Sequence, residues 1–226
     1  MIVAIDGPAG SGKSTVAREV ARRLGFTYLD SGAMYRAVTL LALERGAPLE
    51  EGTTLGRVAR ELEIELRDRD HDYVQVVVDG RDVSELIRAP EVTGASSTVA
   101  AHPEVRAALL EKQRELIGGD RDYVVEGRDI GTVVAPNAPV KVFLTAEPAE
   151  RARRRASELE RRGHRARAEE TRAAIEQRDR LDSTRSAAPL RPAEDAEVID
   201  TTELAADDVV ERVLELVGRA RASARR

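Results

Sequence analysis

Residues 7–14 read Gly-Pro-Ala-Gly-Ser-Gly-Lys-Ser, which matches the Gly-x4-Gly-Lys-Ser/Thr pattern of a phosphate-binding loop. Residues 1–6 are mostly apolar and rich in β-branched side chains, as expected of a buried parallel strand. After the loop, Val16, Val20 and Leu24 are spaced four apart on one face of a helix. Because the motif requires a strand before it and a helix after it, the sequence predicts a site for a nucleoside triphosphate.

Each part of this loop has an expected task. Glycines let successive backbone N–H groups point at phosphate oxygens, and the helix N-terminus adds partial positive charge. We expect Lys13 to reach the β- and γ-phosphates and the Ser14 hydroxyl to bind Mg²⁺. Only three of the 36 basic residues are lysine, and one of them stands here, where a slim, flexible charge suits a crowded loop. The residues expected to surround ATP are Gly7, Pro8, Ala9, Gly10, Ser11, Gly12, Lys13, Ser14 and Thr15.

Composition narrows the class of protein. The 226 residues suit one medium-sized domain with insertions, and no apolar run approaches the ~20 residues that span a bilayer. The chain has no cysteine, which excludes disulfides and thiolate chemistry. A net charge of −5 and 3% aromatic residues argue against nucleic-acid binding. We expect a cytoplasmic monomer without nucleic-acid or membrane partners.

The order of strands and helices predicts an α/β fold. Buried-strand candidates at 2–5, 27–29, 123–126, 140–144 and 197–199 alternate with helical stretches, which predicts a parallel sheet covered on both faces. Residues 64–83 break this alternation and predict an antiparallel hairpin within an insertion at about 60–95.

Helix boundaries and the chain end give further expectations. Ser31 is expected to cap a helix that runs to Gly46, and further helices are expected to begin near Pro103, Pro148 and Thr202. Lys141 is expected to be solvated at a sheet edge. The last nine residues, 218–226, are expected to form a frayed tail.

Further anion-binding segments follow predicted elements: Asp30-Ser-Gly-Ala-Met-Tyr-Arg36 after one strand, Glu126-Gly-Arg-Asp-Ile-Gly-Thr132 after another, and Arg178-Asp-Arg-Leu-Asp-Ser-Thr-Arg185 on a late helix. The carboxyl ends of parallel strands line the ligand crevice of such sheets, so the first two segments should face the phosphate loop. The loop alone does not separate kinases from GTPases, motor ATPases or transporter subunits. No Asn-Lys-x-Asp segment supports a GTPase.

These segments, together with Val-Ala-Ala-His-Pro-Glu-Val-Arg, resemble the bacterial cytidylate (CMP/dCMP) kinases, nucleoside monophosphate kinases of the P-loop class, over essentially the whole chain. The resemblance implies a five-stranded parallel core, a monophosphate-binding insertion at about 60–95 and a helical lid at about 148–168. It implies transfer of the ATP γ-phosphoryl group to CMP or dCMP, with Mg²⁺.

The resemblance also assigns roles by matching motifs. Ser97, Arg106 and Asp129 would read cytosine, because they offer donors and acceptors that complement its edge. The substrate phosphate would be held by Ser31, Arg36, Arg128 and Arg185, with Tyr35 lining the pocket, and the sugar by Arg178 and Asp182. The lid would supply Arg151, Arg154 and Arg155. The expected catalytic set is Lys13, Arg128, Asp129, Arg151, Arg154, Arg155 and Arg185.

The residues also allow other interpretations. Arg151–Arg155 taken alone would be a solvated helix face paired with glutamates, and Arg178–Arg185 a surface ladder. Glu126 could support the metal ion or the phosphate-binding arginines. Isolated histidines (His71, His102, His164) receive no role. A kinase for UMP or another small acceptor, or a nucleotide sensor or ATPase subunit, remains an alternative; the second set of phosphate-binding arginines, Arg36, Arg128 and Arg185, argues against the sensor.

Overall fold

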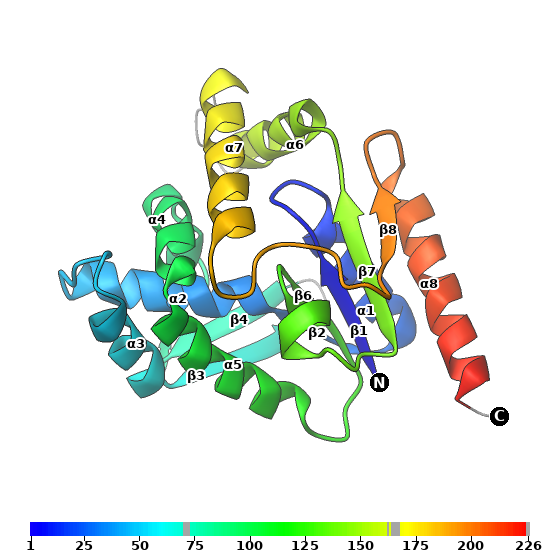
Figure 1. Cartoon of the computed structure of the whole chain (residues 1–226), viewed down its shortest axis with the longest axis horizontal. Helices are drawn as coiled ribbons and strands as arrows, with labels where there is room; N and C mark the ends of the chain where they lie inside the picture. The colour runs from blue at the N-terminus through cyan, green and yellow to red at the C-terminus, as the bar shows by residue number, and fades with distance from the viewer. Residues whose placement is uncertain (70–72, 162, 164–167, 225–226) are drawn as a thin grey trace.

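The computed structural model describes residues 1–69, 73–161, 163 and 168–224. Its centre is a sheet of five parallel strands in the order β2-β6-β1-β7-β8 (Figure 1). The strands are β1 (Ile2–Asp6), β2 (Thr27–Asp30), β6 (Tyr123–Gly127), β7 (Val140–Thr145) and β8 (Glu197–Asp200). The predicted parallel sheet with flanking helices is confirmed.

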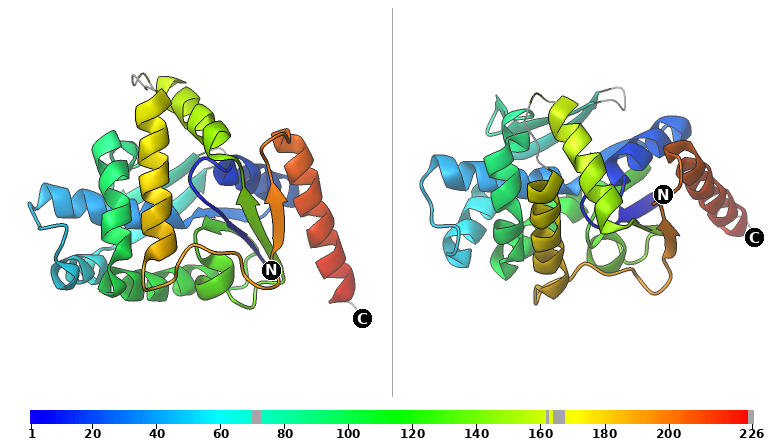
Figure 2. Two further views of the ribbon diagram at one scale, coloured as in Figure 1. Left: turned by 45° about the horizontal axis from the view of Figure 1, so that its top comes forward. Right: turned by 90° about the horizontal axis from the view of Figure 1, so that it is seen from above.

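Helices surround this sheet on both sides. They are α1 (Lys13–Leu24), α2 (Ser31–Glu44), α3 (Gly52–Glu61), α4 (Pro90–Ala101), α5 (Pro103–Ile117), α6 (Pro148–Arg161), α7 (Ala168–Thr184) and α8 (Ala206–Ser223), with short turns η1 (Leu86–Arg88) and η2 (Ile130–Val134). In Figures 1 and 2, α8 lies beside β8 at one side of the molecule, whereas α2 to α5 gather at the other. Helices α6 and α7 rise above the edge where β1 and β7 end.

Two apolar clusters cover the two faces of the sheet. Along β1, Val3 and Ile5 belong to the larger cluster, and Ala4, which points the other way, belongs to the smaller one. The larger cluster draws its members from α1, α2 and α8, among others, and the smaller one includes Ile117 at the end of α5 and Ile130 in η2. Burial on both faces explains why the strands read as continuous apolar runs.

The predicted antiparallel insertion is present as a second, three-stranded sheet. Strands β3 (Ile64–Arg69), β4 (Tyr73–Val78) and β5 (Arg81–Asp82) pair in that order, between α3 and η1. The strand β3 extends to Arg69, and the residues between β3 and β4, which include His71, lie outside the described residues. The role of the segment 60–95 as a separate substrate-binding unit stays a prediction.

The expected cap of α2 is wrong by one residue. Asp30 caps the helix: its Oδ1 accepts a hydrogen bond from the Ala33 backbone N–H at 3.2 Å, and Ser31 is the first helical residue. Asp30 has extended backbone angles because it ends β2, which is the conformation an N-cap needs. Its carboxylate also accepts from Arg36 at 2.6 Å.

The expectation that Lys141 is solvated at a sheet edge is also wrong. Lys141 lies in β7, between β1 and β8, with its side chain only 7% exposed and its Nζ 2.7 Å from Asp195. The stem of Lys141 packs so close to Gly131 that a Cβ there would lie 3.3 Å from it. An aliphatic stem can be covered while its charged tip stays paired at the surface.

The predicted frayed tail is largely helical. Helix α8 continues through Ser223, and the Arg221 guanidinium lies 5.2 Å from the centre of the Phe26 ring. Alanine and arginine, which dominate 218–226, have high helix propensity, so the helix continues past Gly218. The last two residues lie outside the described part.

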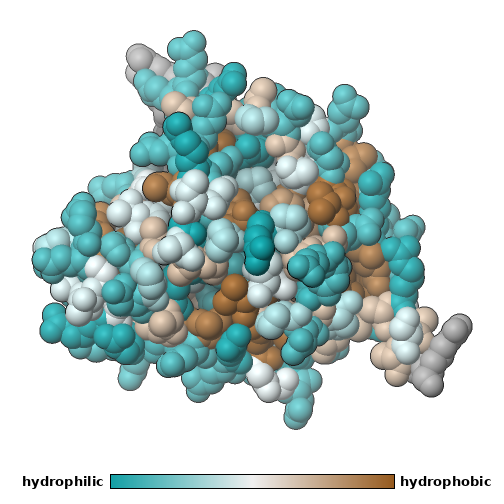
Figure 3. Space-filling view, in the orientation of Figure 1, coloured by the Kyte–Doolittle hydropathy of each residue, from teal (hydrophilic) through white to brown (hydrophobic). Residues whose placement is uncertain are grey.

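The outer surface is mostly polar. Figure 3 shows hydrophilic residues over α6 and α7, and hydrophobic patches that are small and separated on the face drawn. Among the helices of the described residues, none combines the length and apolar character needed to cross a membrane.

Asp6 connects the end of β1 to the η2 turn. Its carboxylate accepts hydrogen bonds from the backbone N–H groups of Ile130 at 2.8 Å and of Gly131 at 2.7 Å. The side chain is buried, and burial raises the pKa of Asp6 to about 6, although these two hydrogen bonds favour the ionised form. Because η2 follows Arg128 and Asp129 directly, Asp6 fixes the backbone that carries both residues.

We predict that Asp6→Ala lowers the free energy of unfolding by about 2–4 kcal/mol, because it leaves two buried N–H groups without acceptors. Urea unfolding measures this change. Asp208→Asn, at an exposed position of α8, is the control and should change it by less than about 0.5 kcal/mol. Equal unfolding free energies for the two variants would contradict this role of Asp6.

Candidate active site

The phosphate loop connects β1 to α1 and is tightly enclosed. A Cβ at Gly7 would lie 2.1 Å from the Leu144 carbonyl oxygen of β7, so only glycine fits there. Gly10 has a φ of 76°, and a Cβ on it would lie 2.8 Å from the Arg151 carbonyl oxygen of α6. The loop therefore sits between the sheet and the predicted lid, with its backbone curled at the start of α1.

Lys13 folds back across its own loop. Its Nζ donates to the Pro8 carbonyl oxygen at 2.6 Å, and the side chain is buried. Burial, and then the nearby Arg128 guanidinium, lower the pKa of Lys13 to about 7. An anion placed beside Lys13 would offset both effects and favour its charged form.

Ser14 contacts an acid on a neighbouring strand. Its hydroxyl donates to Glu126 Oε2 at 2.9 Å, and the Tyr28 hydroxyl donates to Glu126 Oε1. Burial, followed by the negative charge of Asp30, raises the pKa of Glu126. A hydroxyl and a carboxylate are hard oxygen donors, which suits Mg²⁺ held largely by phosphate oxygens and water. Among the described residues no cluster of three or more His, Cys, Asp or Glu could hold a metal by itself.

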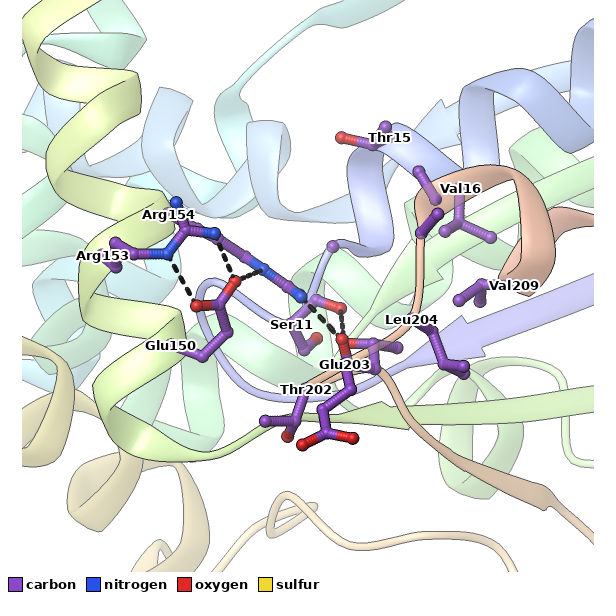
Figure 4. A pocket seen from close by; sticks show the side chains of 14 residues that line it. Ser11, Thr15, Val16, Glu150, Arg153, Arg154, Thr202, Glu203, Leu204 and Val209 are labelled. Atoms are coloured by element: carbon purple, nitrogen blue, oxygen red, sulfur yellow. Dashed lines mark hydrogen bonds and ion pairs between the residues drawn. The ribbon is translucent and has the colours of Figure 1, made fainter.

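A cavity of about 460 Å³ opens beside the loop (Figure 4). Its volume suits a small-molecule site. Glu150, Arg153 and Arg154 of α6 form one wall, and the segment before α8 forms another. The lining residues are Ser11, Gly12, Thr15, Val16, Glu150, Arg153, Arg154, Thr201, Thr202, Glu203, Leu204, Ala205, Ala206 and Val209.

Arg154 spans this cavity from α6 to the end of β8. Its Nη1 and Nη2 donate to Thr201 Oγ1 at 3.0 Å and to the Thr201 carbonyl oxygen at 2.6 Å, and its Nε donates to Glu150 at 2.7 Å. The Thr201 hydroxyl lies 3.2 Å from the Ser11 carbonyl oxygen of the loop. Sequence reasoning missed Thr201, which the predicted element order places at a strand end.

The other two predicted lid arginines have different surroundings. Arg151 is buried; its Nη1 donates to the Ala9 carbonyl oxygen at 3.2 Å and to Asp179 of α7 at 2.5 Å. Arg155 donates to Glu158 at 2.8 Å. The three arginines therefore do not converge on one point in this structure, and their catalytic role stays a prediction. The rest of the predicted lid, with His164, includes residues outside the described part.

Arg106 and Asp129, two of the predicted base readers, form a buried ion pair. Arg106 also lies over the Tyr35 ring, 5.3 Å from its centre, and donates to the Ala100 carbonyl oxygen at 3.2 Å. Ser97 lies one helical turn before Ala100 on α4, and its buried hydroxyl has no hydrogen-bond partner in the described structure. The structure thus brings Arg106, Asp129 and Tyr35 together, with Ser97 on the adjoining helix.

Gln113 belongs to the same region and was missed by sequence reasoning. Its side chain is buried, its Oε1 has no hydrogen-bond partner among the described residues, and its amide interacts with the Tyr35 hydroxyl. Burial raises the pKa of Tyr35 to about 12. Gln113 is two turns after Arg106 on α5, a spacing that could have signalled a shared helix face.

Three of the residues predicted to hold the substrate phosphate and sugar, Arg128, Asp182 and Arg185, belong to a chain of alternating charges. Arg128 Nε donates to Asp182 at 3.0 Å, and Arg185 lies 3.7 Å from Asp182 and 4.0 Å from Asp129. With the Arg106–Asp129 pair, the order is Arg106, Asp129, Arg185, Asp182, Arg128. Although burial opposes ionisation, Arg128 and its neighbours lower the pKa of Asp182.

Several arginine donors in this region have no acceptor. Arg36 Nε, Arg178 Nε and Arg185 Nη2 are buried without a hydrogen-bond partner in the described structure. Burial and then the nearby Arg128 lower the pKa of Arg178 to about 10. An anion bound among them would supply the missing acceptors. The Ser31 hydroxyl donates to the Glu126 carbonyl oxygen at 2.7 Å, and its role toward the phosphate stays a prediction.

Two residues that received no site role have structural partners. Arg88 Nε donates to the Ser84 carbonyl oxygen at 3.2 Å. A ring nitrogen of His102 lies 2.8 Å from the Leu49 carbonyl oxygen, which ties α5 to the segment before α3.

Comparisons with known sequences indicate one family. The family model described as cytidylate kinase matches residues 3–219. A cytidylate kinase of Carboxydothermus hydrogenoformans is 50% identical over 219 residues, which cover 97% of this chain and 98% of the relative. A cytidylate kinase of Geobacillus kaustophilus is 49% identical over 215 residues, which cover 95% of this chain and 95% of the relative. A gluconokinase of Sinorhizobium meliloti shares the fold at 15% identity, with a TM-score of 0.51 over 98% of this chain and 94% of that structure. The chain belongs to the cytidylate kinase family.

Proposed function

We propose that this protein transfers the γ-phosphoryl group of ATP to CMP or dCMP, giving ADP and CDP or dCDP. One observation carries the proposal: the phosphate loop and the arginine cluster are parts of one site. The Ser14 hydroxyl of the loop donates to Glu126, two residues before Arg128, at 2.9 Å. Burial and then the nearby Arg128 guanidinium lower the pKa of Lys13, in keeping with this proximity. A site with two adjoining phosphate-binding parts suits transfer between two phosphates better than hydrolysis of one.

In this reaction the protein positions the phosphates and neutralises charge. The loop N–H groups and Lys13 hold the donor phosphates, and Arg154 closes the cavity that would take the donor base. Arg36, Arg128 and Arg185 hold the acceptor phosphate. Bound Mg²⁺ would neutralise charge that develops between the β- and γ-phosphates; Ser14 and Glu126 are the residues that would hold it.

Cytosine selectivity follows from the buried polar pocket. Arg106 can donate to the O2 and N3 acceptors of cytosine, and Asp129 or Ser97 can accept from its amine. Uracil carries a donor at N3 and an acceptor at O4, so UMP would leave buried groups unpaired. The unpartnered Ser97 hydroxyl and the Arg106–Asp129 pair support this assignment.

We infer that the segment 60–95 and the α6–α7 region move toward the bound nucleotides, which would exclude water from the transfer. Arg151 joins α6 to the loop by its contact with Ala9, and Arg154 does so indirectly through Thr201, whose hydroxyl contacts Ser11. These contacts support a coupling between lid and donor site. We further infer that the protein acts as a cytoplasmic monomer.

The proposal predicts which acceptors stimulate ADP release from ATP and Mg²⁺. CMP and dCMP should stimulate it strongly and should be converted to CDP and dCDP, whereas UMP, AMP and a sample without acceptor should not. Chromatography of the nucleotides identifies the products. Stimulation mainly by another monophosphate would overturn the base-reading roles, and ADP release that ignores every acceptor would favour an ATPase or sensor.

Arg106→Ala should raise the KM for CMP by about 10- to 100-fold, because a hydrogen bond to a charged group contributes about 1.5–3 kcal/mol. The KM for UMP should change less, so the preference for CMP should shrink. Steady-state kinetics with both acceptors, below the melting temperature of each variant, measure this. Arg57→Ala, at an exposed position of α3 outside the segment 60–95, is the matched control. If Arg106→Ala kept both the KM for CMP and the preference, Arg106 would not read the base.

ATP binding should take up a proton at Lys13. The pKa of Lys13 is about 7 in the free protein, mainly because of burial, and the triphosphate charge should raise it. The complex then holds more protons than the free protein, so affinity should fall as the pH rises above about 7. Calorimetry at about pH 8, in buffers of different ionisation enthalpy, should detect uptake of close to one proton.

Lys13→Met is the control for this measurement, since it has no titratable group at the position. It should bind ATP more weakly and lack this uptake. Equal proton uptake by Lys13→Met and the unaltered protein would contradict the assignment to Lys13.

A further inference from the structure

Glu126 is buried with both carboxylate oxygens engaged. One oxygen, Oε2, accepts from the Ser14 hydroxyl at 2.9 Å, and the other, Oε1, accepts from the Tyr28 hydroxyl. Ser14 stands at the start of α1, whereas Tyr28 comes from β2. The carboxylate therefore links the first turn of α1 to β2.

The sheet register explains how Tyr28 reaches Glu126. Tyr28 is directly opposite Val124 in the parallel pair of β2 and β6, and Asp30 is opposite Glu126. Glu126 is thus two residues further along β6, on the same face as the Tyr28 side chain. Tyr28 is 2% exposed, so its hydroxyl lies well below the surface.

The Arg18 side chain lies over the Tyr28 ring. Its guanidinium lies 5.3 Å from the centre of the Tyr28 ring, close enough for a cation–π contact. Arg18 follows Ser14 by one helical turn on α1, so both residues lie on the same helix face. The helix that begins at the phosphate loop therefore contacts the Tyr28–Glu126 pair twice.

The tyrosine hydroxyl holds the Glu126 carboxylate in its orientation. Oε1 accepts from the phenol and Oε2 accepts from Ser14, so the two hydrogen bonds fix both oxygens of the carboxylate. Without the phenol, Oε1 would be a buried acceptor with no donor, and the carboxylate would be free to rotate. Rotation would displace the oxygen that faces Ser14.

From this geometry we propose that Tyr28 is a positioning residue: its hydroxyl fixes the Glu126 carboxylate so that Oε2 orients the Ser14 hydroxyl toward the cation that accompanies ATP. The inference rests on the proposed function, because it assigns Tyr28 a part in binding the metal–ATP complex.

The test uses Tyr28→Phe, which removes the hydroxyl and keeps the ring. Mn²⁺ replaces Mg²⁺, and its binding to the protein together with a non-hydrolysable ATP analogue is followed by electron paramagnetic resonance. We expect about tenfold weaker Mn²⁺ binding in this complex, the usual effect of removing a residue that orients a metal ligand. Affinity for the analogue in EDTA and the KM for CMP should stay unchanged.

Tyr123→Phe is the matched control, since Tyr123 is a buried tyrosine at the opposite end of β6. It should keep the Mn²⁺ affinity of the unaltered protein. A double-mutant cycle with Glu126→Gln shows whether Tyr28 acts through the carboxylate: Tyr28→Phe should then weaken Mn²⁺ binding little further. Additive losses would overturn the proposal.

Two other outcomes also decide the matter. If Tyr28→Phe keeps full Mn²⁺ affinity, or weakens analogue binding equally with Mn²⁺ and in EDTA, Tyr28 has only a structural role and the proposal is wrong. If the protein phosphorylates no monophosphate yet binds Mn²⁺ and the analogue in a Tyr28-dependent way, the proposed function fails and the positioning role stands.

Discussion

The need to bury several like charges close together governs this site. Arginines that grip two phosphates have to lie near one another, and buried cations without partners are strongly destabilising. Five side chains meet this need because their charges alternate, in the order Arg106, Asp129, Arg185, Asp182, Arg128. Each of these three arginines has an acidic neighbour, yet Arg185 Nη2 still has no acceptor among the described residues. The buried charges are thereby compensated, and a donor remains for an anion.

The order of the strands determines where the acids of the site lie. Strands β2, β6 and β1 are neighbours, and an acid stands at or near the carboxyl end of each: Asp30, Glu126 and Asp6. Their partners differ. Asp30 binds Arg36 and caps α2, Glu126 accepts from Ser14 and Tyr28, and Asp6 holds the backbone of η2. A parallel sheet brings these three ends to one edge, so residues far apart in the chain act within a few ångströms.

Errors in the sequence-based predictions share a cause. Ser31, Lys141 and the tail after Gly218 were judged from residue type and local pattern. In the structure, the surroundings of these residues depend on neighbours that the local pattern does not contain. These neighbours are the end of β2 at Asp30, the Gly131 backbone and Asp195 around Lys141, and Phe26 beneath Arg221. Similarly, Arg151, Arg154 and Arg155 share a helix face by spacing, but different partners separate their guanidinium groups.

The sequence by itself determined the phosphate loop, the five strands, the antiparallel insertion and the family, because these depend on local periodicity and on contiguous motifs. Only the tertiary structure decided which charges pair, that Glu126 joins Ser14 to Tyr28, and that Gln113 contacts Tyr35 and Thr201 contacts Arg154. Hydrogen bonds and ion pairs depend on distances of a few ångströms between side chains from different elements. Strand order and register set those distances, and the local patterns of one sequence do not reveal strand order or register.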